Sequence, residues 1–290
     1  MSNQPDKFCK APFRSSVINT DGTLLPCCEY MTHKSNDTVY RLDSRDNSTF
    51  KEWWGKGLDP LRQKMLKGEV DPGCRYCISK EKNPGLGHHR IVMNNRINDD
   101  YQKIKNDYNA GKKEYPPVVE LRIGNFCNLK CIMCGPYASS SLEAEYKMNK
   151  EKFDSLGIHS SASNGDWYKH GHNKDTVLDV VANAREINFG GGEPFISPMI
   201  IEILEAIDSK TPLQFNTNMT KINDKVLNAL EKFDSVHIGA SIDGVGKHNN
   251  YLRYGSDWSI VEDNFKKFQS MPNVRLSIGY ILQHSSVYTL

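Results

Sequence analysis

The chain has 290 residues, with 37 Lys and Arg against 35 Asp and Glu and a formal net charge of +2. This balance argues against a general nucleic-acid binder, which needs a basic excess for its phosphate contacts. No apolar stretch approaches the ~20 residues that span a bilayer, and the opening MSNQPDKFCK lacks the apolar core of a secretory signal. We therefore expect a cytoplasmic protein, in which eight cysteines serve metal binding rather than disulfides.

The first predicted elements form a short hairpin. A strand is expected over Ser15–Asn19, and Asp21-Gly22 turns it into a second strand over Thr23–Leu25. Cys27 lies near the end of this hairpin, two residues after the second strand. Residues 1–88 are otherwise rich in turns and poor in core, so this part of the chain needs a staple such as a metal site.

Two helical segments are expected before the middle of the chain. A short helix is predicted over Leu58–Leu66, ending at Gly68. Residues 89–115 are polar and charged and predict a connecting helix that breaks at Pro116-Pro117.

From Val118 onward, apolar runs alternate with amphipathic stretches. Five runs are predicted strands: Val118–Ile123, Glu186–Phe189, Leu213–Thr217, Val236–Ser241 and Val274–Ile281. Four stretches have helical spacing: Ser140–Phe153, Ser197–Ser209, Asn223–Lys232 and Ser259–Ser270. The alternation predicts an α/β fold with a parallel sheet, either open or part of a barrel, whose reactive groups lie at the carboxyl ends of the strands.

A polar stretch over residues 155–175 suggests an insertion above one face. Its histidines, His159, His170 and His172, are expected to be solvated loop residues, because no carboxylate or cysteine stands beside them at metal-ligand spacing.

Three cysteines follow the first of the five predicted strands closely, in the segment Cys127-Asn-Leu-Lys-Cys131-Ile-Met-Cys134. This spacing lets three thiolates converge on one metal centre and leaves one coordination position open, as in catalytic metal sites. The alternative is a zinc knuckle, but a structural zinc site needs a fourth protein ligand and none is near in sequence.

This C-x3-C-x2-C pattern resembles the signature of the radical S-adenosylmethionine (SAM) enzymes. The resemblance implies a partial (β/α) barrel and a [4Fe-4S] cluster on Cys127, Cys131 and Cys134, with the open iron chelated by the amine and carboxylate of SAM. It also implies reductive cleavage of SAM to a 5'-deoxyadenosyl radical that abstracts hydrogen from substrate. An electron donor such as flavodoxin or ferredoxin would supply the reducing equivalent.

The same resemblance implies a set of cofactor-binding residues. The stretch Gly190-Gly191-Gly192-Glu193-Pro194 resembles the GGEP motif of the family, whose glycines admit the ligand and whose glutamate can face an ammonium group. A serine and a downstream arginine hold ribose and carboxylate in similar peptide-modifying enzymes. The expected cofactor-binding residues are Met133, Gly191, Gly192, Glu193, Asn218, Ser241 and Arg253.

Some of these assignments keep an alternative. Asn216 and Asn218 could equally be loop-capping residues, and Met133 could simply be packed. No residue is identified as a general base.

The N-terminal cysteines resemble a narrower group. The pattern Cys9-x12-Gly22-x4-Cys27 followed by Cys74-x2-Cys77 resembles the twitch part of the SPASM/twitch auxiliary-cluster modules. The resemblance implies a second [4Fe-4S] cluster, fully ligated by Cys9, Cys27, Cys74 and Cys77 and suited to electron transfer. A single zinc site with the same four ligands is the alternative. Cys28 is left over, as a spare or substitute ligand or a free buried thiol.

We therefore expect a twitch-like domain over residues 1–88, a connecting helix over 89–115 and a radical SAM partial barrel over 116–290. Five strand-helix units are visible where the family has six, so the chain is expected to be truncated, split or completed by another chain. The predicted function is radical SAM chemistry on a substrate, with a peptide side chain favoured over a small alcohol or sugar. The alternative is a non-catalytic, zinc- or cluster-stabilised binding module with a degenerate barrel.

Overall fold

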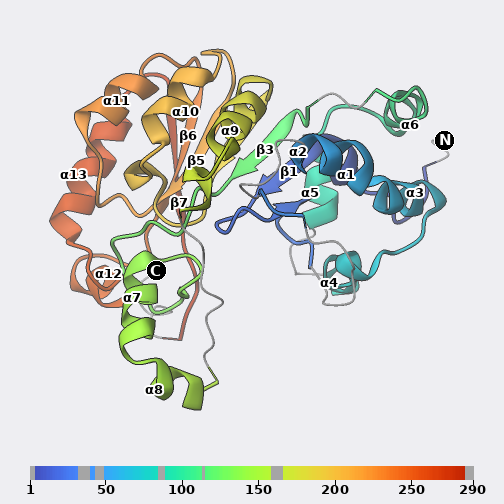
Figure 1. The fold of residues 1–290 in the computed structure, drawn as a ribbon. Coiled ribbons are helices and arrows are strands. Elements are labelled where there is room, and N and C mark those ends of the chain that lie inside the picture. Colours follow the sequence, from blue (N-terminus) through green and yellow to red (C-terminus); the bar gives the residue numbers. More distant parts are fainter. Residues whose placement is uncertain are drawn as a thin grey trace.

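The computed structural model describes residues 4–31, 40–42, 49–83, 89–112, 115–157 and 166–284. Its centre is a seven-stranded sheet in the order β2-β1-β3-β4-β5-β6-β7, parallel except for the pair β1 and β2 (Figure 1). The strands are β1 (Ser15–Ile18), β2 (Leu24–Leu25), β3 (Val118–Leu121), β4 (Glu186–Phe189), β5 (Leu213–Thr217), β6 (Val236–Ser241) and β7 (Val274–Gly279). All five strands predicted from Val118 onward are confirmed.

The α-helices are α1 (Ala11–Arg14), α2 (Thr49–Glu52), α3 (Asp59–Lys67), α4 (Arg75–Lys80), α5 (His89–Arg96), α6 (Tyr101–Asn109), α7 (Ser140–Met148), α8 (Lys150–Ser155), α9 (Asn173–Ala182), α10 (Ile200–Ala206), α11 (Asp224–Leu230), α12 (Lys247–Leu252) and α13 (Trp258–Gln269). A π-helical turn at Trp53–Gly57 joins α2 to α3, and short 3-10 turns lie at Pro72–Cys74, Trp167–Lys169 and Pro194–Ile196. No helix in the part of the chain described is long and apolar enough to cross a membrane.

The sheet is larger than the five strands predicted, because the N-terminal hairpin joins it. β1 runs parallel to β3, with Ser15 opposite Val118 and Ile18 opposite Leu121. All four residues of β1 are buried, so both edges of this strand need a hydrogen-bonding partner. β3 pairs with one edge of β1, and β2, which follows the predicted turn, pairs with the other.

Two predicted helices are each divided. The connecting helix over 89–115 is two helices, α5 and α6, because Asp100 accepts a hydrogen bond from the Lys103 N–H and caps a new helix there. The helix predicted over Ser140–Phe153 breaks at Asn149, whose ψ of 32° is not helical.

Helix α9 was not predicted; it begins at Asn173, at the end of the polar stretch over 155–175, and runs to Ala182. Its buried residues, Val177, Val180 and Val181, lie at helical spacing. Three β-branched valines weaken the helix signal, and packing against the sheet supplies the stability instead.

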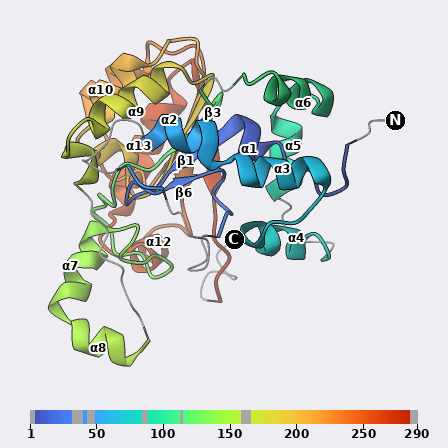
Figure 2. The same ribbon diagram turned by 45° about the vertical axis from the view of Figure 1, so that its right-hand side comes forward.

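The two faces of the sheet differ in polarity. Helices α9, α10, α11 and α13 cover one face of the sheet (Figures 1 and 2). The N-terminal helices lie beyond β1, at that end of the sheet. The helix-covered face is apolar: Leu121, Phe189, Phe215 and Ile238 stand side by side across the strands and are buried. The rings of Phe189 and Phe215 stack at 4.3 Å. This core fixes the carboxyl ends of β3 to β6, where the predicted motifs lie.

Candidate functional site

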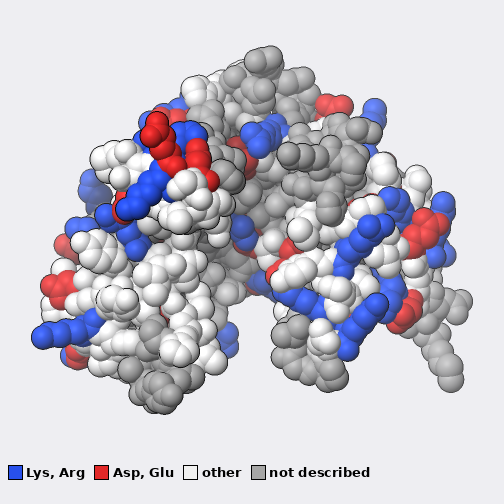
Figure 3. All heavy atoms as spheres, turned by 90° about the horizontal axis from the view of Figure 1, so that it is seen from below, with Lys and Arg blue, Asp and Glu red and all other residues white. Residues whose placement is uncertain are grey.

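Most predicted site residues of the second half of the chain lie in loops after β3, β4 and β5, while Ser241 ends β6 and Arg253 follows α12. Figure 3 shows the molecule from below, the side on which α7 and α12 lie in Figure 1. A hollow separates the barrel half from the N-terminal half, and Lys and Arg side chains gather on the N-terminal half beside it. The arrangement agrees with the expectation that reactive groups lie at this edge.

The cysteine loop after β3 is fixed by hydroxyl groups from the start of α7. The N–H of Cys127 donates to the Ser140 hydroxyl at 3.1 Å, and the Ser141 hydroxyl donates to the Cys127 carbonyl at 2.9 Å. Ser139 donates to the Leu129 carbonyl at 2.6 Å while also capping the helix. Leu129 is fully buried, so it anchors the middle of the loop.

The far end of the same loop is tied to the segment that follows α12. The N–H of Lys130 donates to the Tyr254 carbonyl, and that of Ile132 donates to the Leu252 carbonyl. These two backbone bonds place the loop beside Arg253.

The three thiols of this loop differ in exposure. Cys127 is half-buried, Cys131 is buried and Cys134 is exposed. Burial raises the pKa of the Cys131 thiol to about 11, and it raises the pKa of Cys127 as well. Within the described ranges, no three His, Cys, Asp or Glu side chains are close enough to hold a single metal ion. A four-iron cluster is larger than one ion, so its thiolates stand farther apart.

The glycine-rich loop after β4 packs directly on the start of the cysteine loop. The N–H of Glu193 donates to the Phe126 carbonyl at 2.6 Å. A Cβ on Gly192 would stand 2.2 Å from that same oxygen, so only glycine fits. Gly191 has φ +96°, a conformation that favours glycine.

Glu193 joins the carboxyl ends of β4 and β5. Its side chain accepts hydrogen bonds from the Thr217 hydroxyl at 2.8 Å and from the Asn218 N–H at 2.7 Å. Burial raises the pKa of this carboxyl group to about 7. The structure thus shows the carboxylate engaged with protein donors, whereas the motif predicts that it faces a ligand ammonium group.

The two asparagines at the carboxyl end of β5, Asn216 within the strand and Asn218 just after it, have different surroundings. The Asn218 amide nitrogen lies 3.8 Å from the Cys127 sulfur, and its oxygen accepts from Thr220. The Asn216 side chain lies over the sheet, where its oxygen would be 2.8 Å from a Cβ on Gly239. Asn218 alone of this pair touches the cysteine loop in the contacts observed.

Arg253 lies where three predicted motifs meet. It is 8% exposed and forms an ion pair with Asp243 at 2.8 Å. Its positive charge acts to lower the pKa of both Cys131 and Glu193, against the larger effect of burial. Its Nε is buried and has no hydrogen-bond partner among the described residues. An unpaired buried donor is costly unless something accepts from it. This buried, unpaired donor fits a ligand carboxylate such as that of SAM.

Two further predicted residues lie near these groups without a defined contact. Ser241 is the last residue of β6 and is half-buried. Met133 is half-buried within the cysteine loop.

The four N-terminal cysteines come together although they are far apart in sequence. Cys9, Cys27, Cys74 and Cys77 line one cavity, beside Tyr30 and Arg90 among others. Burial and the neighbouring thiols raise the pKa of Cys9 to about 11 and that of Cys74 to about 12. Backbone N–H groups reach the sulfurs of Cys9, Cys27 and Cys77. A bound cation or cluster would favour the thiolate forms of these buried cysteines.

Cys28 is separate from these four. It is exposed, and its sulfur lies 3.6 Å from the His89 Nε2. His170 and His172 are also exposed, in agreement with their predicted solvation. His159 lies outside the described residues.

Comparison with known protein families decides the identity. The sequence model of the Radical SAM superfamily matches residues 121–283, more than half of the chain. The chain belongs to the radical SAM superfamily. A second model, the iron-sulfur cluster-binding domain SPASM, matches residues 9–78. These matches confirm the resemblance drawn from the two sets of cysteines and support cluster and SAM binding in this radical SAM protein.

Individual relatives are more distant. An uncharacterized protein of Methanocaldococcus jannaschii, MJ0907, is 30% identical over 139 residues, which are 46% of this chain and 40% of the relative. The chain thus matches less than half of that relative's length. Streptococcus suis SuiB bound to S-adenosylmethionine is 15% identical with a TM-score of 0.40, covering 100% of this chain and 60% of SuiB. SuiB bound to the precursor peptide SuiA has the same identity and TM-score, covering 75% and 48%.

Sequence reasoning missed the polar face of the radical SAM sheet. Strand pairing places polar side chains in one row across five strands: Glu120, Asn188, Gln214, His237 and Arg275. Arg96 of α5 reaches this face and pairs with Glu186 and Asn188. The signal was present in the sequence, because strands of a parallel sheet covered on both faces are continuously apolar, whereas β4 to β7 alternate.

Proposed function

We propose that this chain is an enzyme that holds a [4Fe-4S] cluster on Cys127, Cys131 and Cys134 and uses it with SAM to start radical chemistry. When bound, the cluster and SAM supply a 5'-deoxyadenosyl radical that abstracts a hydrogen atom from substrate. The surrounding protein must bind SAM, orient it and keep water away.

The observation that carries this proposal is the meeting of the loops after β3, β4 and β6 at Arg253. Its unpaired Nε would donate to the SAM carboxylate, and Asp243 would hold the guanidinium in place through the ion pair. Gly192 would contribute by letting the glycine loop pack on Phe126, which holds that loop against the cysteine loop. Glu193 would act mainly as a positioning residue, because it links the glycine loop to Thr217 and Asn218.

The polar face of the sheet supports a polar substrate. Asn188, Gln214 and His237 lie in one row on that face and are all only half-buried. Such groups can bind amide and hydroxyl groups while leaving an aliphatic C–H free for abstraction. We favour a peptide side chain, by analogy with the SPASM/twitch enzymes that the N-terminal cysteines resemble.

We further propose that Cys9, Cys27, Cys74 and Cys77 hold a second [4Fe-4S] cluster. Four protein ligands leave no open iron for substrate, so electron transfer is the role that this ligand set supports. Backbone N–H groups directed at three of the sulfurs would tune its potential. Flavodoxin or ferredoxin is the kind of donor expected to reduce the protein.

The test begins with metal analysis after anaerobic purification and reconstitution. We expect about eight irons with matching sulfide per chain, and 5'-deoxyadenosine that forms from SAM only when a reductant is present. Cys131→Ala should retain about four irons and form no 5'-deoxyadenosine. Cys77→Ala should also retain about four irons but still cleave SAM. Stoichiometric zinc without iron would instead support the non-catalytic binding module.

A further inference from the structure

A second cavity lies at the opposite end of the strands from the cysteine loop. It has a volume of ≈ 760 Å³ and opens at the amino ends of three strands, because Arg14 immediately precedes β1, Pro117 precedes β3 and Arg185 precedes β4. A strand of four residues spans roughly 13 Å, so this cavity is distinct from the SAM site.

The cavity concentrates positive charge. Six cations line it: Arg14, Lys51, Arg62, Lys103, Lys112 and Arg185. Among the described residues, two carboxylates, Asp99 and Asp107, line it with them. The described lining residues therefore carry an excess of four positive charges, whereas all 290 residues together carry a net charge of only +2. Charge of one sign gathered in a concave site raises the local concentration of the opposite ion.

One end of the cavity is a shared ion-pair cluster. Arg14 bridges the two carboxylates, with its Nε 2.6 Å from Asp99. Lys103 lies 2.9 Å from Asp107 and 3.3 Å from Asp99, and Lys112 lies 3.7 Å from Asp107. Three cations thus share two carboxylates. Both lysine side chains are more than half exposed, so they keep donors for a ligand.

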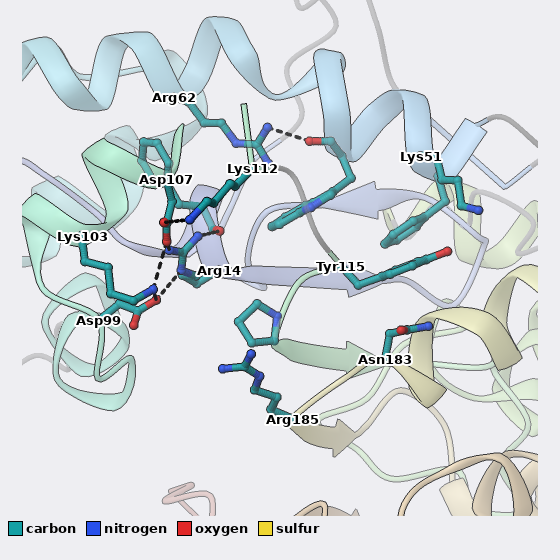
Figure 4. Close-up of a pocket in the computed structure, with 14 residues that line it drawn as sticks. Arg14, Lys51, Arg62, Asp99, Lys103, Asp107, Lys112, Tyr115, Asn183 and Arg185 are labelled. Atoms are coloured by element: carbon teal, nitrogen blue, oxygen red, sulfur yellow. Dashed lines mark hydrogen bonds and ion pairs between the residues drawn. The ribbon is translucent and has the colours of Figure 1, made fainter. Parts of the chain in front are cut away.

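Arg185 lies at the other end of the cavity. Arg185 is exposed, and its guanidinium has no ion pair or side-chain hydrogen bond among the residues described. Its backbone is fixed, because its N–H donates to the Pro117 carbonyl at 2.8 Å. Figure 4 shows the side chain rising from the start of β4 toward Arg14, into the cavity.

Two other cations contribute less directly. Arg62 is buried and donates hydrogen bonds to the carbonyls of Pro12 and Trp54, so it stabilises the cavity wall rather than binding a ligand. Lys51 lies at the rim, 3.8 Å from Asp179 and 5.8 Å from the centre of the Tyr115 ring. Its side chain is 72% exposed and can turn toward a ligand.

We propose that this cavity is a binding site for a small phosphorylated molecule, with Arg185 as its main anchor. A phosphate group carries nearly two negative charges and three acceptor oxygens, so it can draw Lys103 and Lys112 away from Asp107. A ligand with a single carboxylate would only replace Asp107 as the partner of these lysines by a group of equal charge. The cavity volume lies within the range of small-molecule sites.

The test is calorimetric titration of the reconstituted holoenzyme, with excess SAM present to fill the other site. Inorganic pyrophosphate and ADP are the two probes, and hexaglutamate is the comparison anion. We expect saturable one-to-one binding of a phosphate probe that weakens as salt rises. Arg185→Gln should lower the affinity by about tenfold, and Lys51→Gln by less. The matched control is Lys232→Gln, which removes an exposed cation outside the cavity and should change nothing.

Tighter binding of ADP than of pyrophosphate would support a nucleotide-like ligand, and the reverse order would support a simple phosphate ester or anhydride. Binding that Arg185→Gln and Lys51→Gln leave unchanged, or no binding of either probe, would overturn the proposal. Tighter, Arg185-dependent binding of hexaglutamate would overturn it in favour of an acidic peptide. Production of 5'-deoxyadenosine by Arg185→Gln should equal that of the wild type, which separates this site from the radical chemistry.

Discussion

The contact between the glycine loop and the cysteine loop gives the sharpest test of the SAM site. In Gly192→Ala the new Cβ would lie 2.2 Å from the Phe126 carbonyl oxygen. A carbon and an oxygen in contact need about 3.3 Å, so the two loops must separate by about 1 Å. The hydrogen bond from the Glu193 N–H to the same oxygen, now 2.6 Å, would then be lost.

Two costs follow from that separation. An unmade buried hydrogen bond costs about 1–3 kcal/mol of stability. A misplacement of about 1 Å at a reacting centre can cost about 100-fold in rate. We expect Gly192→Ala to bind its full complement of iron, because no cysteine changes, and to form 5'-deoxyadenosine about 100-fold more slowly than the wild type.

Gly190→Ala is the matched control from the same motif. Its Cβ would meet nothing closer than Glu120 Oε1 at 3.9 Å, and its φ is not positive. We expect iron content, SAM affinity and rate within about twofold of the wild type, since ordinary contacts cost little. The assays are iron analysis, SAM binding and reductant-dependent 5'-deoxyadenosine formation. The reasoning fails if Gly192→Ala turns over at the wild-type rate, or if Gly190→Ala is equally impaired.

Three further predictions concern charge, potential and ligand identity. The folded-state pKa of Glu193, about 7, lies above its unfolded value of 4.5, so its contribution to stability is complete below pH 4.5 and is lost as pH rises through 7. Urea unfolding should show a loss of about 1 kcal/mol between pH 6 and pH 8 that Glu193→Gln abolishes. Asn218→Leu removes the amide facing the Cys127 sulfur and should lower the potential of that cluster by about 40 mV, the equivalent of ~1 kcal/mol. Cys27→Ser should reduce the iron content to about four per chain, whereas Cys28→Ser should leave about eight. The reason is that Cys27 lines the N-terminal cavity and Cys28 does not.

Each of these predictions has a clear contrary outcome. An unchanged pH slope in Glu193→Gln would assign that slope to another group. A potential that does not move in Asn218→Leu, measured by redox titration of the cluster signal, would show that the amide does not bond to the sulfur. Loss of iron in Cys28→Ser equal to that in Cys27→Ser would make Cys28 a ligand.

Local spacing in the sequence was sufficient to predict the strands of the radical SAM domain and both sets of cysteines. A strand signal needs only a few neighbouring residues, and Cys127, Cys131 and Cys134 lie within eight positions, so no long-range contact has to be known. The two family models match residues 121–283 and 9–78, and these ranges contain both sets of cysteines. The N-terminal cysteine pattern also indicated which four of five thiols would share a cavity, through the glycine five residues before Cys27.

Tertiary structure decided the features that depend on residues far apart in the chain. Strand β1 joins the sheet because it is buried on both sides and β3 offers a free edge. Arg253 pairs with Asp243 and keeps one buried donor unpaired, which no spacing rule could show. The cationic cavity exists only because the starts of β1, β3 and β4 lie side by side, bringing Arg14, Asp107 and Arg185 around one space. Sequence fixes which groups a short loop carries, but a site built from several strand ends forms only when the sheet orders those ends in space.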